Sequence, residues 1–175
     1  MGAGDGGYVL HRARTEPTSF AIAIDASPDA LARGAWSAKR AHLANAAFLV
    51  EGVERLPREL ACLADEVTVH FPWGSLLQGL LDGSSSVVGS VAALMKNRAE
   101  LRVLVSAGVR DGFGAVTPSV ITSRCANYLQ HGLRRVDARW ASSEVIRESR
   151  SAWAKRLGVG RTRPAVIARY RRDAT

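Results

Sequence analysis

A tryptophan held between a proline and a glycine is the feature of this sequence that points most directly to chemistry. Trp73 follows Pro72 and precedes Gly74, shortly after the apolar run 67–69, which is typical of a buried strand. Pro72 removes a backbone donor and Gly74 loosens the chain, so strand pairing is expected to stop here. In open α/β sheets, ligands bind at the carboxyl ends of the strands, where this indole would lie. The alternative is an aromatic side chain that covers the end of the sheet.

A glycine-rich turn at residues 2–7 points to a second ligand-binding element. In nucleotide-binding α/β folds such a turn follows the first strand, and its glycines let the backbone approach the ligand. An acidic residue about 20 positions further on binds the ribose hydroxyls. Asp25 ends an apolar run at that spacing, so the turn and Asp25 together predict a nucleotide-binding site.

No strand precedes this turn, although the first strand of the fold is central and paired on both sides. Its absence would leave unpaired backbone groups on two neighbouring strands. We therefore expect Met1 to be an internal methionine of a longer reading frame. The alternative is a true start, with another element filling the slot.

The composition restricts the class of protein. The chain has 175 residues, enough for a single domain (1–175) with a substantial core, and a net charge of +8. Excess positive charge attracts polyanions, of which nucleic acid is the commonest; the alternative is that the charge serves solubility alone. No apolar run is long enough to span a bilayer. The cysteines and histidines are scattered, so we expect a cytoplasmic protein without a metal site, in which His70 satisfies a hydrogen bond in the sheet.

The elements that position these residues follow from the apolar pattern. Strands alternate with helices, which predicts an α/β fold with a mostly parallel sheet and helices on both faces. The glycine-rich segment 107–118 is expected to be a loop. The predicted strands are 19–25, 47–53, 66–71, 101–105, 135–140 and 165–170, and the predicted helices are 28–40, 86–98, 119–130 and 143–157.

Two sequence blocks are similar to those of a known family. They are Phe-Pro-Trp-Gly-Ser-Leu-Leu at 71–77 and Ser-Ala-Trp-Ala-Lys-Arg-Leu at 151–157, and they stand in the family's order behind the glycine turn and Asp25. The chain resembles the aminoglycoside-resistance 16S rRNA methyltransferases of the kanamycin–apramycin type, which modify N1 of an adenine in the decoding site. The resemblance implies a Rossmann-like class I S-adenosylmethionine-dependent methyltransferase fold, here without its first strand. It also implies an enzyme whose partner is 16S rRNA within the 30S subunit, and we expect a monomer.

The resemblance further implies roles for single residues. Trp73 and Trp153 would sandwich the target adenine with Ser151 close by, whereas Trp36 and Trp140 are expected to be packing residues. Residues 37–45, which include Lys39 and Arg40, would contact RNA, although this stretch is shorter and less basic than in relatives. The cofactor would be bound by Gly2, Gly4, Asp25, Gly52, Val53, Glu54, Pro72 and Ser75, and RNA phosphates by Lys155, Arg156, Arg161 and Arg163.

The implied chemistry asks the protein mainly to position its substrate. The N1 atom of adenine carries a free lone pair, so no general base is needed, and a sulfonium is already a strong methyl donor. The base must be taken out of its stack and held in line with the methyl group. Two indole faces would do this, since base–aromatic stacking contributes about 1–3 kcal/mol per base. The same faces would favour the cationic product.

Two other functions stay open at the level of sequence. One is methylation of another RNA or of a small metabolite, and the other is a non-catalytic, RNA-binding remnant that cannot hold the cofactor. The acidic residue that precedes the first glycine in relatives would lie upstream of Met1, and the region 105–135 is shorter than theirs. These departures weaken the prediction of the exact RNA target, whereas the prediction that the protein is a methyltransferase stands.

Overall fold

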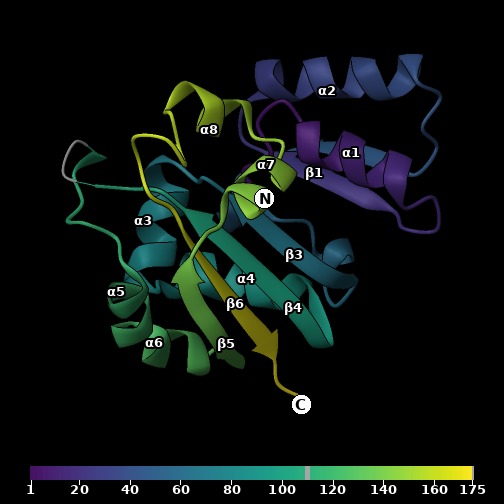
Figure 1. Ribbon diagram of the computed structural model, residues 1–175. Coiled ribbons are helices and arrows are strands. Elements are labelled where there is room, and N and C mark those ends of the chain that lie inside the picture. The colour runs from purple at the N-terminus through teal and green to yellow at the C-terminus, as the bar shows by residue number, and fades with distance from the viewer. Residues whose placement is uncertain (109–110, 175) are drawn as a thin grey trace.

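The computed structural model describes residues 1–108 and 111–174, whose strands form two sheets (Figure 1). β1 (Ala21–Asp25) pairs in parallel with β2 (Ala46–Val50). The second sheet has the order β3-β4-β6-β5, in which β3 and β4 are parallel and the other two pairings are antiparallel. The described strands are thus a mixed arrangement, where a mostly parallel sheet was predicted. The bounds are Ala64–His70 for β3, Met95–Val105 for β4, Leu133–Trp140 for β5 and Val166–Arg172 for β6.

Residues 1–3 lie between the two sheets. The amino group of Met1 donates a hydrogen bond to the carbonyl of Thr68 in β3 at 2.8 Å. The N–H of Ala3 donates one to the carbonyl of Ile24 in β1 at 3.1 Å. These residues therefore occupy part of the slot that the sequence analysis expected, and the longer reading frame stays a prediction.

The main core lies on one face of the four-stranded sheet, under the helices between β3 and β5 (Figure 1). Side chains such as Val69, Leu101 and Val166 point into it and are almost fully buried. These helices are α3 (Gly74–Asp82), a π-helical turn (Ser85–Gly89), α4 (Ser90–Leu94), α5 (Pro118–Ser123) and α6 (Cys125–Leu129).

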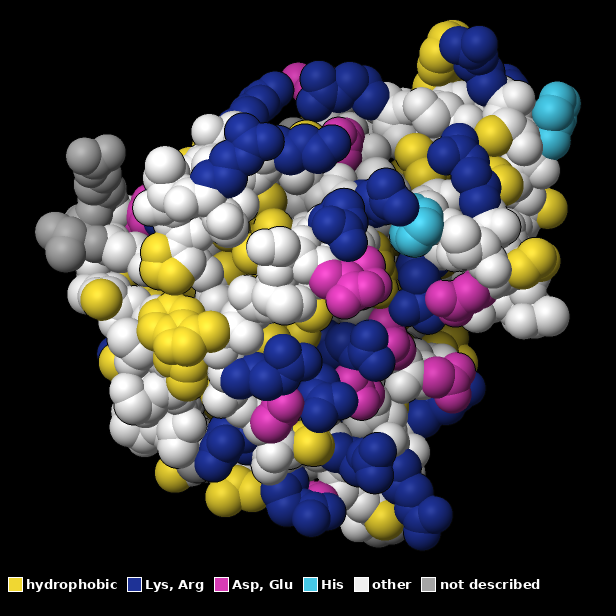
Figure 2. All heavy atoms as spheres, viewed as in Figure 1, with side chains coloured by type: hydrophobic (Ala, Val, Ile, Leu, Met, Phe, Trp, Pro, Cys, Tyr) yellow, Lys and Arg dark blue, Asp and Glu magenta, His cyan; other side chains and the backbone are white. Residues whose placement is uncertain are grey.

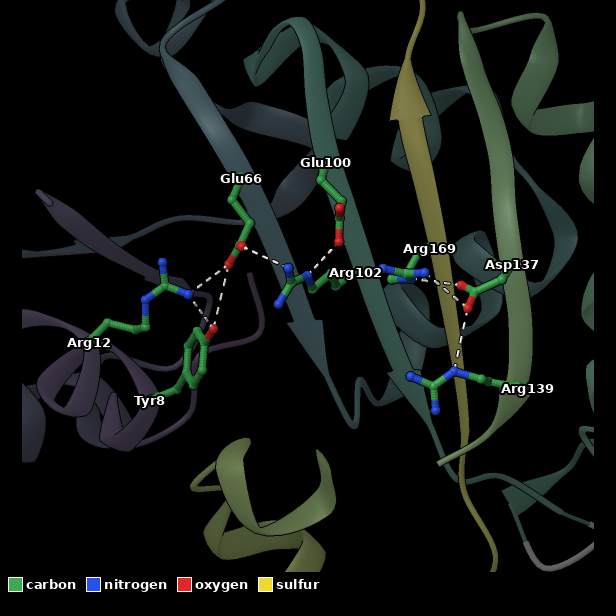
Figure 3. Close-up of polar contacts among 8 residues, drawn as sticks. All are labelled: Tyr8, Arg12, Glu66, Glu100, Arg102, Asp137, Arg139 and Arg169. Atoms are coloured by element: carbon green, nitrogen blue, oxygen red, sulfur yellow. Dashed lines mark hydrogen bonds and ion pairs between the residues drawn. The ribbon is translucent and has the colours of Figure 1, made fainter. Parts of the chain in front are cut away.

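The opposite face of that sheet is covered only at one end. There Leu104 and Ile167 form a small core with Phe71, under α7 (Ser143–Glu148) and α8 (Ala152–Arg156). The rest of the face carries charged side chains, which pair within β4 and across neighbouring strands (Figure 3). Pairing of opposite charges keeps this open face compatible with water.

Two helices pack on the smaller sheet, where Val9, Ala23 and Leu31 form a third core. They are α1 (Gly7–Thr15) and α2 (Pro28–Arg40). α2 begins at the residue that the sequence predicts, because Ser27 caps it by accepting a hydrogen bond from the N–H of Ala30 and Pro28 suits the first position. Two 3-10 turns, Val53–Arg55 and Arg58–Leu60, follow β2.

Several predicted elements differ from those observed. α1 was not predicted, and the predicted helix 86–98 ends at Leu94, where β4 begins. The predicted helix 119–130 is interrupted at Arg124. The predicted helix 143–157 is interrupted at residues 149–151, where Arg150 has a left-handed φ of 52°. Residues 109–110 of the predicted loop lie outside the described residues. Among the residues that the structure describes, no helix is long and apolar enough to cross a membrane.

Candidate active site

The glycine-rich turn and the end of β1 are joined through one carboxylate. One oxygen of Asp25 accepts a hydrogen bond from the backbone N–H of Gly4 at 2.7 Å, and the other accepts one from the N–H of Ser27 at 2.9 Å. Gly2 and Gly4 have φ values of 60° and 54°, which glycine adopts without strain. Asp25 therefore fixes the turn against both β1 and the start of α2.

α2 supports this turn through a close backbone contact at Gly34. A Cβ atom added at Gly34 would lie 2.5 Å from the carbonyl oxygen of Asp5 and 2.7 Å from Cε1 of Phe48. The position therefore has no room for a side chain. Sequence reasoning missed this residue, although the signal was present: a glycine inside a helix is unfavourable unless close packing needs it.

A cavity of about 760 Å³ opens beside the turn. This volume is typical of sites for small molecules and cofactors. The cavity is lined by the loops that follow β1, β2 and β3, together with the segment between α7 and α8 (Figure 1). Every residue predicted to bind the cofactor lines it: Gly2, Gly4, Asp25, Gly52, Val53, Glu54, Pro72 and Ser75.

Two tryptophans from distant parts of the sequence meet at the mouth of this cavity. Trp73 and Trp153 both line it, and they are 56% and 39% exposed. Their ring centroids lie 5.9 Å apart and their planes are inclined by 65°, an edge-to-face contact. Aromatic rings favour this geometry when they contact each other directly. The pair thus presents indole faces to solvent beside the cavity.

Each indole is placed by the start of a helix. Trp73 is the extended residue directly before α3, two residues after Phe71, whose φ of 52° turns the chain. Trp153 is the second residue of α8. Ser151 caps α8, because its hydroxyl accepts a hydrogen bond from the N–H of Ala154 at 3.1 Å. Ser151, which also lines the cavity, therefore positions Trp153 through the helix.

The residues expected to contact RNA phosphates differ in their surroundings. Lys155 and Arg156 are exposed on α8, where Arg156 also lines the cavity, and Arg161 is exposed in the following loop. Arg163 is half-buried, and its guanidinium forms an ion pair with Asp111. That pair joins two loops, so Arg163 is engaged within the protein where the others face solvent.

Trp36 and Trp140, which were expected to be packing residues, lie at the surface. They are 60% and 50% exposed. Trp36 lies near the end of α2, close to the exposed Lys39 and Arg40, and the guanidinium carbon of Arg40 lies 4.7 Å from the centroid of its ring. Figure 2 shows basic side chains over both α2 and α8.

Two aromatic residues that sequence reasoning did not place in the site also line the cavity. The rings of His70 and Tyr8 contact each other edge to face, with centroids 4.5 Å apart. Burial lowers the pKa of His70 to about 4. The sequence analysis expected the His70 ring to form a hydrogen bond within the sheet, whereas the ring forms one with the backbone of Ser149, which lies outside the sheet. The hydroxyl of Tyr8 accepts a hydrogen bond from Arg12, which pairs with Glu66 (Figure 3). This network anchors the wall of the cavity to β3.

The site has the chemistry of a binding cleft. In the part of the chain that the structure describes, no group of three or more His, Cys, Asp or Glu side chains is placed to hold a metal ion. Cys62 is free and exposed, and the side chain of Cys125 lies outside the described part. The glycine turn and the carboxylate of Asp25 suit a nucleotide-like cofactor inside the cavity. The two indoles at its mouth suit a flat ring beside that cofactor.

Several known proteins are similar to this chain over most of its length. A 16S rRNA (adenine(1408)-N(1))-methyltransferase from Escherichia coli is 27% identical over 177 residues, which cover 93% of this chain and 81% of that protein. The crystal structure of the aminoglycoside resistance methyltransferase NpmB1 is 31% identical, with a TM-score of 0.74 over 98% of this chain and 84% of that one.

A third comparison bears on the fold. A mutant of the Catenulisporales acidiphilia 16S rRNA (adenine(1408)-N(1))-methyltransferase, crystallised with its cosubstrate SAM, is 24% identical. Its TM-score is 0.84 over 99% of this chain and 84% of that one. The predicted methyltransferase fold is thereby confirmed. The family model described as NpmA, 16S rRNA (adenine(1408)-N(1))-methyltransferase, matches residues 1–171. The chain therefore belongs to the family of 16S rRNA (adenine(1408)-N(1))-methyltransferases.

Proposed function

We propose that this chain transfers a methyl group from S-adenosylmethionine to N1 of an adenine in the decoding site of 16S rRNA, within the assembled 30S subunit. The modification would confer resistance to aminoglycosides that bind there. The observation that carries the proposal is the meeting of Trp73 and Trp153 at the mouth of the cavity, with centroids 5.9 Å apart. Family membership over residues 1–171 supports it independently.

The cavity fits S-adenosylmethionine in size and in the acceptor group that it offers. Gly2 and Gly4 let the backbone approach the methionine end, since neither carries a side chain. A carboxylate has about four acceptor positions, so Asp25 can accept ribose hydroxyls while it holds the N–H groups of Gly4 and Ser27. Gly52 to Glu54 would border the adenine ring of the cofactor, and Pro72 and Ser75 would close the cavity beside the methyl group.

When bound, S-adenosylmethionine supplies an activated methyl group on a positively charged sulfur. The residues of the chain then have two tasks, to hold the target base and to exclude water. The adenine N1 carries a free lone pair, so it needs no deprotonation. Trp73 and Trp153 would stack on the two faces of the flipped adenine and would stabilise the positive charge that develops on its ring.

The basic residues around the mouth would hold the rRNA backbone. Lys155, Arg156 and Arg161 are exposed on the α8 side, and Lys39 and Arg40 on the α2 side. Each contact with a phosphate adds to a salt-dependent affinity. Arg163 acts indirectly in this scheme, because its ion pair with Asp111 shapes the loop that follows Arg161. We infer further that the enzyme works as a monomer in the cytoplasm, where 30S subunits are found.

The test is to incubate the purified chain with 30S subunits and S-adenosylmethionine carrying a labelled methyl group, and to map the product by primer extension. The expected result is one methylated adenine in the decoding site, with aminoglycoside resistance in cells that express the chain. A methyl group mapped to another RNA would contradict the proposed target but would support the proposed methyl-transfer reaction. Absence of heat in calorimetry with millimolar S-adenosylmethionine would reject the enzyme itself.

A further inference from the structure

The outer side of α2 carries a large aromatic side chain that the fold does not use for packing. The buried side of the helix is formed by Leu31, Gly34 and Ala38. Trp36 lies on the other side and is 60% exposed. Burial in water-free surroundings is the state that an indole favours. A solvent-facing tryptophan that contributes little to the core is therefore a candidate for a contact with a partner.

The neighbours of Trp36 show what kind of partner this is. The guanidinium of Arg40, one helical turn further on, lies over the indole with its central carbon 4.7 Å from the ring centroid. Arg33 is three residues before Trp36, and Lys39 three residues after, so both lie beside it on the helix surface. An exposed aromatic face among three cations is complementary to an unpaired nucleotide, whose base stacks and whose phosphate is negative.

This patch is continuous with the active site. Arg33 and Ser37 of α2 line the same cavity as Trp73, Trp153 and Arg156. Trp36 is adjacent to Ser37 in sequence and to Arg33 on the helix surface, so it borders the wall of the cavity. Figure 2 shows basic side chains on both sides of this region, over α2 and over α8. An RNA strand that delivers its adenine to the cavity would therefore pass over Trp36.

We propose that Trp36 is a second stacking site, which holds an unpaired nucleobase of the rRNA other than the methylated adenine, with Arg40 covering one face of the indole and contacting a phosphate. This inference rests on the proposed function. Trp36 is a binding residue in this account and does not touch the reacting atoms. Its role is to fix the position of the substrate RNA relative to the cavity.

The test compares binding of labelled protein variants to 30S subunits over a range of salt concentrations. Trp36→Ala should weaken binding by about 5- to 150-fold, the effect of losing one base–aromatic stack. The slope of log K against log salt should stay unchanged, since no phosphate contact is lost. Arg40→Gln should make that slope shallower by the contribution of about one phosphate contact. Trp36→Phe should restore most of the affinity, because it keeps an aromatic face.

Controls separate this role from folding and from the main proposal. Trp140→Ala removes another half-exposed tryptophan, on the edge strand β5, and should leave 30S binding unchanged. Trp36→Ala should keep the wild-type melting temperature and affinity for S-adenosylmethionine. Binding of Trp36→Ala to 30S subunits within twofold of wild type would overturn the inference alone. A wild-type chain that methylates no adenine of the 30S subunit would instead overturn the proposed function.

Discussion

Trp73 and Trp153 contact each other edge to face, with ring planes inclined by 65° and centroids 5.9 Å apart. A base stacked between two indoles needs parallel rings about 7 Å apart, because each stacked contact spans about 3.5 Å. In the proposed sandwich, one ring would therefore rotate as the adenine enters. Trp153 is the better placed to do so, since it lies on a five-residue helix that follows the left-handed residue Arg150. At the observed centroid separation of 5.9 Å, the two rings leave no room for a base between them.

The contact between Gly34 and the glycine turn predicts the effect of a single added methyl group. Gly34→Ala would place Cβ 2.5 Å from the carbonyl oxygen of Asp5, so the turn must shift. Such overpacking costs about 1–3 kcal/mol in stability. The affinity for S-adenosylmethionine, measured by calorimetry, should fall at least tenfold. Gly114→Ala is the control, because its Cβ would meet no atom within 4 Å, and it should bind the cofactor as the wild type does.

The ion pairs of Glu66 predict how strongly α1 is tied to the four-stranded sheet. Its carboxylate lies 3.0 Å from Arg12 of α1 and 3.6 Å from Arg102 of β4, and all three side chains are partly buried (Figure 3). Glu66→Gln should lower the free energy of unfolding in urea by about 1 kcal/mol, since both arginines lose a charged partner. Asp65→Asn breaks the more exposed pair with Lys96 and should change stability by less than about 0.5 kcal/mol. Equal effects of the two variants would contradict this role for Glu66.

Burial of His70 predicts a loss of stability in mild acid. Its pKa is lowered to about 4 in the folded protein, chiefly by burial, whereas an unfolded histidine titrates near its usual value of 6.5. Between these values the unfolded chain binds more protons, so stability falls as the pH drops from 6.5 towards 4. Melting temperatures at pH 7.5 and pH 5 should therefore differ by fewer degrees in His70→Gln than in the wild type. His42→Gln, at an exposed position, should keep the wild-type difference.

Local signals in the sequence predicted much of the fold. Ser27 and Pro28 mark the start of α2, and its predicted bounds of 28–40 agree with the structure. The apolar run that ends at Asp25 predicted β1, with a carboxylate at its last residue. Such elements are predictable because capping, proline geometry and apolar spacing act over a few residues.

The misses share a different cause, since each depends on contacts between distant segments. The break between α7 and α8 lies at Arg150, whose backbone packs near Gly7. No local sequence pattern indicates this break. Arg163 stays a predicted RNA contact, and its ion pair with Asp111 of another loop is a contact that no local pattern indicates. Trp36 was expected to be a packing residue, whereas the exposed side of α2 that it occupies follows from the positions of Leu31 and Ala38.

The most direct test of the account is the rate of methyl transfer to 30S subunits by Trp153→Ala under single-turnover conditions, with both substrates saturating. We predict a loss of at least about 100-fold, because one stacking face and its stabilisation of the cationic ring disappear together. Binding of S-adenosylmethionine should stay within twofold of wild type, and Trp153→Phe should recover most of the rate. A Trp153→Ala variant that methylates the decoding-site adenine at the wild-type rate would contradict the account.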